Sequence, residues 1–453
     1  MNTPTLTYDF ATKPLPDRED SFWLDGKQVS HAFCEALPPE VADLLDVAMA
    51  IYAADRRSVR DYKGAQSGLR HIHARIGVRN LTLWNDASVV QSLHELLSWL
   101  SGDDWSVDFA KRESAPMLAE SEQFLFHLPP KQPAVVSLFS GGLDSLAGLA
   151  GGLHGEPIGS RVLVSGYTHN RLAAQQRTQV QRIKSVLRER FVEGGLEMHH
   201  VAVRFGIPKV KREEPSQRTR ALVYLALGVA AAAQARADTL WVYENGIGAL
   251  NLPINETQLG VDNYRGVHPR SLIMAERFFA IALDRPIRIE NPFLFHTKAE
   301  MCKALELAGL SEAIQDTVSC DSFPLRVPNQ PSQCGYCTSC IFRRQALWVS
   351  GLGRYDPATE YWLDLVTDCI AWNGGKAYGL YAMSGQVHKL AGCLVAQDPW
   401  GSLAATFPEL ARTHAELEAL GGSGADLKDG FLRLYETYVQ EWRNLPVPLK
   451  LAA

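Results

Sequence analysis

The stretch that most constrains the fold is residues 134–148, Ala-Val-Val-Ser-Leu-Phe-Ser-Gly-Gly-Leu-Asp-Ser-Leu-Ala-Gly. Its apolar run from Ala134 to Phe139 predicts a buried parallel strand, and a helix of small residues follows the two glycines. Adjacent glycines let the backbone turn sharply, and the helix directs its positive end at the same place. The pattern therefore predicts an anion-binding cradle, with an ordinary glycine-rich turn as the alternative. It is not a Walker A loop, because no Gly-Lys-Ser/Thr follows.

Composition limits the class of protein. With 453 residues and 46% hydrophobic content, the chain is expected to fold into two or three globular domains. A net charge of -5 argues against a broad nucleic-acid-binding surface. No apolar run has the length of a membrane span, and residues 1–20 contain no signal-peptide core. We therefore expect a cytoplasmic protein with no membrane partner.

The central part of the chain, residues 132–348, alternates strands and helices. This alternation predicts an α/β fold with a five-stranded parallel sheet covered by helices on both faces. After the first strand, the strands are expected at 161–165, 198–204, 239–243 and 287–290. The helices are expected at about 144–153, 171–193, 217–236 and 271–283, and the third should be buried because it is apolar nearly all round.

Two further regions flank this sheet. Residues 1–131 predict a small α+β domain, with a loose arm at 1–20, strands at 21–30, 69–78, 104–109 and 123–128, and helices at 38–55 and 88–100. Residues 349–453 predict a helical extension without obvious chemistry. In the N-terminal region a structural role is expected, rather than a binding face, for Tyr52, Arg56, Arg57 and Trp84.

Ligands of open parallel sheets bind at the carboxyl ends of the strands. Those ends carry Ser140-Gly141-Gly142, Gly166-Tyr167-Thr168-His169, Arg204 and Glu244-Asn245-Gly246, which are therefore expected to converge on one site.

A second motif follows the sheet. Cys320 precedes Cys334-Gly335-Tyr336-Cys337-Thr338-Ser339-Cys340, in which two Cys-x-x-Cys steps overlap. Such steps present two thiolates from one tight turn, and four thiolates suit tetrahedral zinc. We predict a structural Zn²⁺ site formed by Cys320, Cys334, Cys337 and Cys340, with a redox or iron–sulfur role as the alternative.

The glycine motif, Ser-Gly-Gly-Leu-Asp-Ser at 140–145, resembles the signature of PP-loop ATP pyrophosphatases at every position. Those enzymes, whose fold is also called adenine nucleotide alpha hydrolase-like, cleave ATP between its α- and β-phosphates. The motif is followed in a familiar order by Tyr167-Thr168-His169, Gln217-Arg218-Thr219-Arg220, Thr297-Lys298-Ala299-Glu300 and the cysteine set. Over about residues 134–348 the chain resembles the 7-cyano-7-deazaguanine synthase (QueC) family. The resemblance implies ATP and 7-carboxy-7-deazaguanine as substrates.

Roles for single residues follow from charge and from the resemblance. The loop residues Ser140, Gly141, Gly142, Leu143 and Ser145 are predicted to hold phosphate oxygens, and Asp144 is predicted to hold Mg²⁺ or orient the pyrophosphate. Lys298, whose motif matches the family, and Arg220 are expected to neutralise the leaving pyrophosphate. Surface positions remain the alternative for both, and also for Arg218. Substrate contacts are predicted for Tyr167, His169, Glu244, Asn245 and Asn251. Glu244 is predicted to read the base by accepting two hydrogen bonds, from its guanine-like N–H and its exocyclic amine, with a loop or capping role as the alternative.

The chain departs from the family in its length and in the loop at 243–251. Enlarged QueC-like proteins of this appearance occur in bacterial anti-phage operons of the Qat and type IV CBASS kinds, and this resemblance implies attachment of a deazaguanine to a partner protein's N-terminal amine. Three hypotheses follow: a ligase acting on a protein encoded in the same operon, a nitrile-forming synthase that uses ammonia, and a non-catalytic nucleotide-binding or RNA-binding scaffold. A PP-loop tRNA sulfurtransferase is disfavoured, because no other cysteine falls near the sheet's carboxyl edge. The added regions could instead serve stability or a homodimer.

Overall fold

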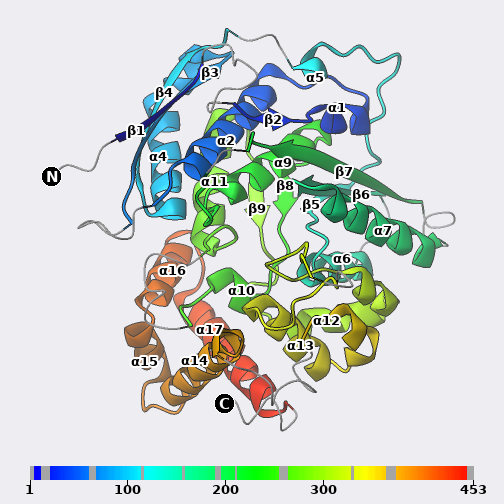
Figure 1. Cartoon of the computed structure of the whole chain (residues 1–453), viewed down its shortest axis with the longest axis vertical. Coiled ribbons are helices and arrows are strands. Elements are labelled where there is room, and N and C mark those ends of the chain that lie inside the picture. The colour runs from blue at the N-terminus through cyan, green and yellow to red at the C-terminus, as the bar shows by residue number, and fades with distance from the viewer. Residues whose placement is uncertain are drawn as a thin grey trace.

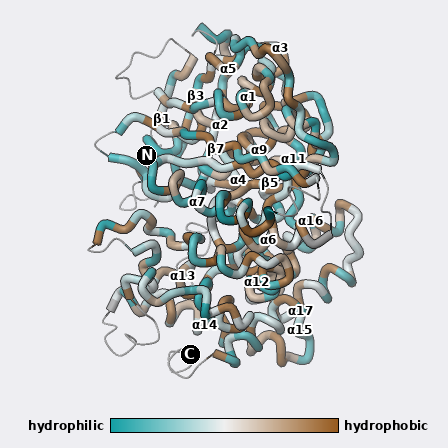
Figure 2. The backbone as a smooth tube through the Cα atoms, turned by 90° about the vertical axis from the view of Figure 1, so that its right-hand side faces the viewer, coloured by the Kyte–Doolittle hydropathy of each residue, from teal (hydrophilic) through white to brown (hydrophobic). Residues whose placement is uncertain are grey.

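The computed structural model in Figure 1 contains a central sheet with the N-terminal elements at one end and the C-terminal helices at the other. Figure 2 shows the same separation from a second direction. Among the described residues, no helix is both long and apolar enough to cross a lipid bilayer. The structure describes residues 5–11, 21–60, 68–113, 117–155, 159–188, 195–209, 212–254, 264–327, 331–363 and 374–445.

The central sheet has the strand order β2-β7-β6-β5-β8-β9. Five of its strands are parallel, as the sequence predicts: β5 (Ala134–Leu138), β6 (Gly159–Tyr167), β7 (Leu196–Gly206), β8 (Thr239–Trp241) and β9 (Arg288–Glu290). The sixth strand, β2 (Trp23–Leu24), lies within the strand expected at 21–30, but it belongs to the central sheet, where it pairs antiparallel with β7.

The position of β2 has a local cause. The exposed edge of β7 leaves backbone groups that need partners, and the N–H of Asp25 donates to the carbonyl of Arg204 at 2.8 Å. Gly206 makes room for the Trp23 ring, because a Cβ there would lie 2.5 Å from a ring carbon. A segment of the N-terminal region therefore completes the central sheet, which is six-stranded and not five-stranded.

Helices cover both faces of this sheet, as predicted (Figure 1). One face is covered by α9 (Arg220–Gln234) and α11 (Pro269–Ala282), and α9 is buried along almost its whole length. The other face is covered by α6 (Leu143–Gly155), α7 (Asn170–Val186) and α12 (Lys298–Leu307). Alternation along β6 explains the two layers: Val162 and Val164 belong to the first core and Leu163 to the second.

The N-terminal region contains a second, parallel sheet in the order β1-β3-β4. Its strands are β1 (Thr5–Phe10), β3 (His71–Val78) and β4 (Asp104–Lys111), and its helices are α1 (Lys27–Phe33), α2 (Pro39–Arg57), α3 (Leu81–Trp84), α4 (Ala87–Ser101) and α5 (Leu118–Ser121). Helices α2 and α4 share one hydrophobic core with α9 and α11, so this region is packed tightly onto the central layer.

Three sequence expectations for the N-terminal region are wrong, wholly or in part. The arm expected at 1–20 contains β1, whose alternating Leu6, Tyr8 and Phe10 are half-buried, and the rings of Tyr8 and Phe10 pack against the core. The strand expected at 21–30 is right only for β2, since residues 27–30 begin α1. The strand expected at 123–128 is irregular, because its side chains find no core: Leu125 is fully exposed.

The chain after the sheet is helical, as expected. It comprises α13 (Thr338–Val349), α14 (Tyr378–Leu394), α15 (Pro399–Thr406), α16 (Pro408–Ala419) and α17 (Gly424–Arg443), with short 3-10 turns at Ser311–Asp316, Gly353–Tyr355, Ala358–Glu360 and Gly374–Lys376. These helices form a third core, which also includes Leu250 at the end of α10 (Gly246–Leu250). The C-terminal helices thus pack against the loop that follows β8.

Candidate active site

The glycine loop leaves the carboxyl end of β5 and begins α6. Gly141 has a φ of +83°, and a Cβ there would lie 2.6 Å from Oε1 of Gln175. Two amides of α7 hold the loop: Gln175 donates to the carbonyl of Gly141 at 2.8 Å, and Gln176 donates to that of Ser140 at 3.0 Å. The positive backbone angle therefore favours glycine at position 141, and any side chain there would also displace the Gln175 amide that holds the loop.

Hydrogen bonds within the loop fix its two serines. Ser140 Oγ accepts the N–H of Gly142 at 3.2 Å, and Ser145 Oγ donates to the carbonyl of Gly142 at 2.9 Å. The two hydroxyl oxygens lie 3.3 Å apart at the N-terminus of α6. Hydroxyls and a helix N-terminus together are suited to phosphate oxygens.

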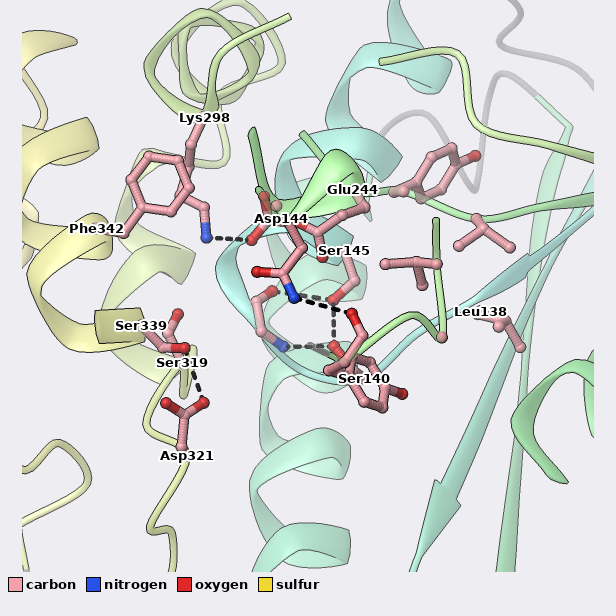
Figure 3. A pocket seen from close by; sticks show the side chains of 18 of the residues that line it. Leu138, Ser140, Asp144, Ser145, Glu244, Lys298, Ser319, Asp321, Ser339 and Phe342 are labelled. Atoms are coloured by element: carbon pink, nitrogen blue, oxygen red, sulfur yellow. Dashed lines mark hydrogen bonds and ion pairs between the residues drawn. The ribbon is translucent and has the colours of Figure 1, made fainter. Parts of the chain in front are cut away.

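Four polar side chains meet beside this loop. Lys298 Nζ lies 2.7 Å from Asp144 Oδ2, and the two side chains point toward each other in Figure 3. The amide of Asn245 donates to Asp144 Oδ1 at 2.9 Å and to Glu244 Oε1 at 2.7 Å. Asn245 is fully buried, so it links the two carboxyl groups from the protein interior.

Burial and charge set the protonation of this group. Burial, reinforced by the charge of Asp144, raises the pKa of Glu244 to about 8. For Lys298, burial acts to lower the pKa, but the negative charges of Asp144 and Glu244 outweigh it, so its pKa is raised. At neutral pH the cluster therefore carries a charged lysine and a largely protonated Glu244.

The residues present do not offer a ready magnesium site. Both oxygens of Asp144 are engaged, one by Lys298 and the other by Asn245. A cation at Asp144 would have to displace the ammonium group, which already supplies positive charge there. The Mg²⁺ prediction therefore remains a prediction, and no step below depends on it.

Lys298 is held in place by its helix and by an aromatic ring. Thr297 caps α12 through a reciprocal capping box with Glu300, and its hydroxyl donates to Glu441 of α17 at 2.5 Å. The ammonium of Lys298 lies 4.7 Å from the centre of the Phe342 ring. The side chain is only 8% exposed, so it is not the surface lysine of the alternative reading.

These groups open into a cavity of about 740 Å³, which is within the usual range for a small-molecule site. Its walls come from many segments between β5 and α17. Beyond the loop and strand ends they include Phe342 and residues of the C-terminal helices: Met383, Gln386, Tyr435 and Tyr438.

Most of the residues predicted for the site are brought together. The predicted residues that line the cavity are Ser140, Gly142, Asp144, Ser145, Arg220, Glu244, Asn251 and Lys298. Gly141, Leu143 and Asn245 are not among the lining residues, and Leu143 belongs to the core beneath α6.

Tyr167 and His169 lie apart from the cavity. His169 caps α7, where its ring accepts the N–H of Leu172 at 3.2 Å, and burial lowers its pKa. Asn251 does line the cavity, but its amide donates to the carbonyl of Tyr264 at 2.9 Å, so it also shapes the wall. The roles predicted for these three side chains remain predictions.

Several residues that line the cavity were not predicted from the sequence. Tyr224 lies one turn after Arg220 on α9, a spacing that would have placed it on the same helix face. The lining residues Asp321 and Ser339, joined by a 2.8 Å hydrogen bond, adjoin the cysteine motif. Nothing local in the sequence marks the C-terminal wall, because its tyrosines read as ordinary core residues.

The four motif cysteines gather as predicted. One Sγ from each of Cys320, Cys334, Cys337 and Cys340 lies within 4.8 Å of all the others. The N–H groups of Cys334 and Cys337 point at the sulfurs of Cys320 and Cys334 at 3.3 and 3.2 Å. Four sulfurs with such backbone donors fit a closed, structural zinc site. Because Ser339 lies between two of these cysteines, the same turn also forms part of the cavity wall.

Comparison with known proteins bears on this central region. Residues 234–351 match the family model described as queuosine biosynthesis protein QueC. The match covers about a quarter of the chain and includes Glu244, Lys298 and the four cysteines, while the glycine loop precedes it. It supports a QueC-like, ATP-using domain of ligase type with a deazaguanine-type substrate. No curated protein matched the chain.

Proposed function

We propose that the protein is an ATP-dependent ligase that adenylates the carboxylate of 7-carboxy-7-deazaguanine and transfers the acyl group to an amine. The acceptor is the N-terminus of a partner protein encoded in the same operon, in anti-phage defence. The observation that carries the ligase assignment is the Asp144–Lys298 pair at the N-terminus of α6, within a cavity whose lysine side belongs to the QueC match.

The chemistry requires two transfers. A carboxylate oxygen of the acid attacks the α-phosphorus of ATP, the bond to the bridging oxygen breaks, and pyrophosphate leaves. The amine nitrogen then attacks the acyl carbon, loses a proton, and displaces AMP. An ATP-binding set of Ser140, Gly142 and Ser145 holds the phosphates, and Lys298 balances the charge that develops on pyrophosphate.

The nature of the amine acceptor is argued from the walls of the cavity. Ammonia needs no binding surface, whereas this cavity has an added wall from α14 and α17. Glu441 and Arg433 of α17 also contact the start of α12, which carries Lys298, so the added helices are joined to the reacting region. Such a wall favours an acceptor that must be positioned, because positioning raises the effective concentration of a dilute amine.

The test is a product analysis by mass spectrometry. The full-length protein is incubated with ATP and 7-carboxy-7-deazaguanine, either with ammonium or with each protein encoded in its operon. We expect AMP, pyrophosphate and one operon protein carrying a deazaguanine acyl group. Efficient nitrile formation from ammonium, with no modified protein, would identify a synthase. Absence of both AMP and pyrophosphate would leave the scaffold hypothesis.

A further inference from the structure

Arg220 is a cation of the cavity that forms no ion pair with any described residue. It enters the cavity from the first turn of α9, and its Nη1 donates to Oε1 of Gln217 at 3.1 Å. Its Nε is buried without a hydrogen-bond partner, and no carboxylate among the described residues lies within ion-pair distance of its guanidinium. A partly buried guanidinium that lacks a counter-charge lowers the stability of the folded protein, and binding of an anion would remove this cost.

We propose that Arg220 forms a separate oxyanion subsite that holds the carboxylate of the acid substrate, an inference that rests on the proposed function. A guanidinium binds a carboxylate with two parallel hydrogen bonds, a geometry that an ammonium cannot offer. The ring of Tyr224, 5.9 Å from the guanidinium carbon, forms the adjacent wall of the subsite. Its ring fits there because position 166 is glycine, where a Cβ would lie 2.6 Å from a ring carbon.

The arrangement of the two cavity cations assigns them different anions. Lys298 lies on α12, on the same face of the sheet as α6, and adjoins the glycine loop that suits phosphate. Arg220 lies on α9, which covers the opposite face, so it reaches the cavity from the other side. Two substrates that must meet at one phosphorus atom need two anion sites, and Arg220 supplies the second. This replaces the pyrophosphate role that the sequence predicts for Arg220.

The N-terminal region positions this arginine. The hydroxyl of Tyr52 on α2 donates to the same Gln217 oxygen at 3.2 Å, and Gln217 has a φ of +48°. Asp55, also on α2, accepts the N–H and the hydroxyl of Thr219 at 3.0 and 2.8 Å. Two side chains of α2 therefore fix the turn that aims Arg220, which makes Tyr52 and Asp55 positioning residues.

A ligand-deletion experiment tests the subsite. Calorimetry measures the dissociation constants of 7-carboxy-7-deazaguanine, of 7-deazaguanine lacking the carboxylate, and of ATP, for the full-length protein and for Arg220→Gln. The wild type should prefer the acid by about 10- to 100-fold, the value of a charge-assisted pair, and Arg220→Gln should lose that preference while ATP binding changes little. A preference for the acid that survives Arg220→Gln, or that the wild type lacks, would overturn the subsite. A selective loss of ATP affinity would assign Arg220 to phosphate.

Tyr52→Phe tests the positioning. It should raise the KM for the acid about 3- to 10-fold with little change in kcat, because Arg220 remains but its anchor is lost. The matched control is Tyr361→Phe, which removes a buried hydroxyl that donates to Asp356 at 2.8 Å outside the cavity and should leave this KM unchanged. Equal effects of both variants on KM would contradict a positioning role. Failure of the proposed function is separate: the wild type would then release no AMP with ATP and the acid.

Discussion

The titration of Glu244 makes the stability of this protein depend on pH in a direction that can be tested. Its pKa is raised from 4.5 to about 8, by burial and then by the charge of Asp144. The folded state therefore keeps a proton that the unfolded state releases. Stability from this group is complete below about pH 4.5 and is lost as the pH rises through about 8.

The size of the effect follows from the two pKa values. One proton held by the folded state alone changes the free energy of unfolding by about 1.4 kcal/mol per pH unit. Because Glu244 is half titrated near pH 8, its contribution should fall by roughly 2 kcal/mol between pH 6 and pH 8. In Glu244→Gln the side chain stays neutral, so this part of the pH dependence should disappear.

The assay is urea unfolding of the wild type and Glu244→Gln at pH 6, 7 and 8. Other buried carboxyl groups, such as Glu441, contribute equally to both proteins and cancel in the comparison. Glu312→Gln, at an exposed position, is the control and should keep the wild-type slope. Equal pH slopes in the wild type and Glu244→Gln would refute the reasoning.

The same titration bears on the predicted reading of the base. If Glu244 accepts two N–H groups as a carboxylate, binding must release its proton. The affinity for 7-carboxy-7-deazaguanine should then rise by up to about tenfold per pH unit below pH 8 in the wild type, but not in Glu244→Gln. An affinity that is flat with pH would mean that Glu244 meets the ligand as a neutral acid.

Three further predictions concern catalysis, the metal and the C-terminal wall. Asp144→Ala should abolish pyrophosphate release with an unchanged far-ultraviolet circular dichroism spectrum. The charge of Asp144 helps to raise the pKa of Glu244, so its removal favours an ionised Glu244 beside Lys298; a normal release rate would contradict the prediction. Elemental analysis should find one zinc per chain, lost in Cys334→Ser together with thermal stability, whereas a coloured iron cluster would disprove the assignment. Tyr361→Phe should destabilise the protein by about 1–2 kcal/mol and Tyr435→Phe should not, because only the first hydroxyl has a partner in the described structure; thermal unfolding would show equal losses if this is wrong.

The parallel core of the fold was predictable because it repeats one physical pattern. Apolar runs that end in glycine or polar residues, separated by amphipathic or apolar helices, permit few other arrangements. A strand was expected around Trp23 and Leu24, but its place in the central sheet was not predictable, because two paired residues carry no sign of their partner strand. Its pairing depends on the free edge of β7 and on Gly206, which lie almost two hundred residues away.

The site likewise contains parts that the sequence predicts and parts that depend on the tertiary fold. The glycine loop, Lys298 and the cysteines are local motifs, and the structure brings them to adjoining places. Asn245 was predicted to contact substrate, and in the structure its amide nitrogen donates hydrogen bonds to Asp144 and Glu244. A sequence shows that an amide is present at a strand end, but the partners that use its hydrogen bonds depend on the tertiary fold.

The N-terminal region and the C-terminal helices both contact residues of the site, so deleting either of them is a poor test of its function. Deleting residues 1–131 would remove β2 from the sheet, α2 from a shared core, and the anchors of Gln217 and Thr219. Loss of activity after such a deletion would therefore say nothing about partner docking. At the other end, Glu441 on α17 accepts from the residue next to Lys298. Point substitutions such as Tyr52→Phe leave both cores intact, so they can separate the alignment of the reacting groups from the recruitment of an acceptor.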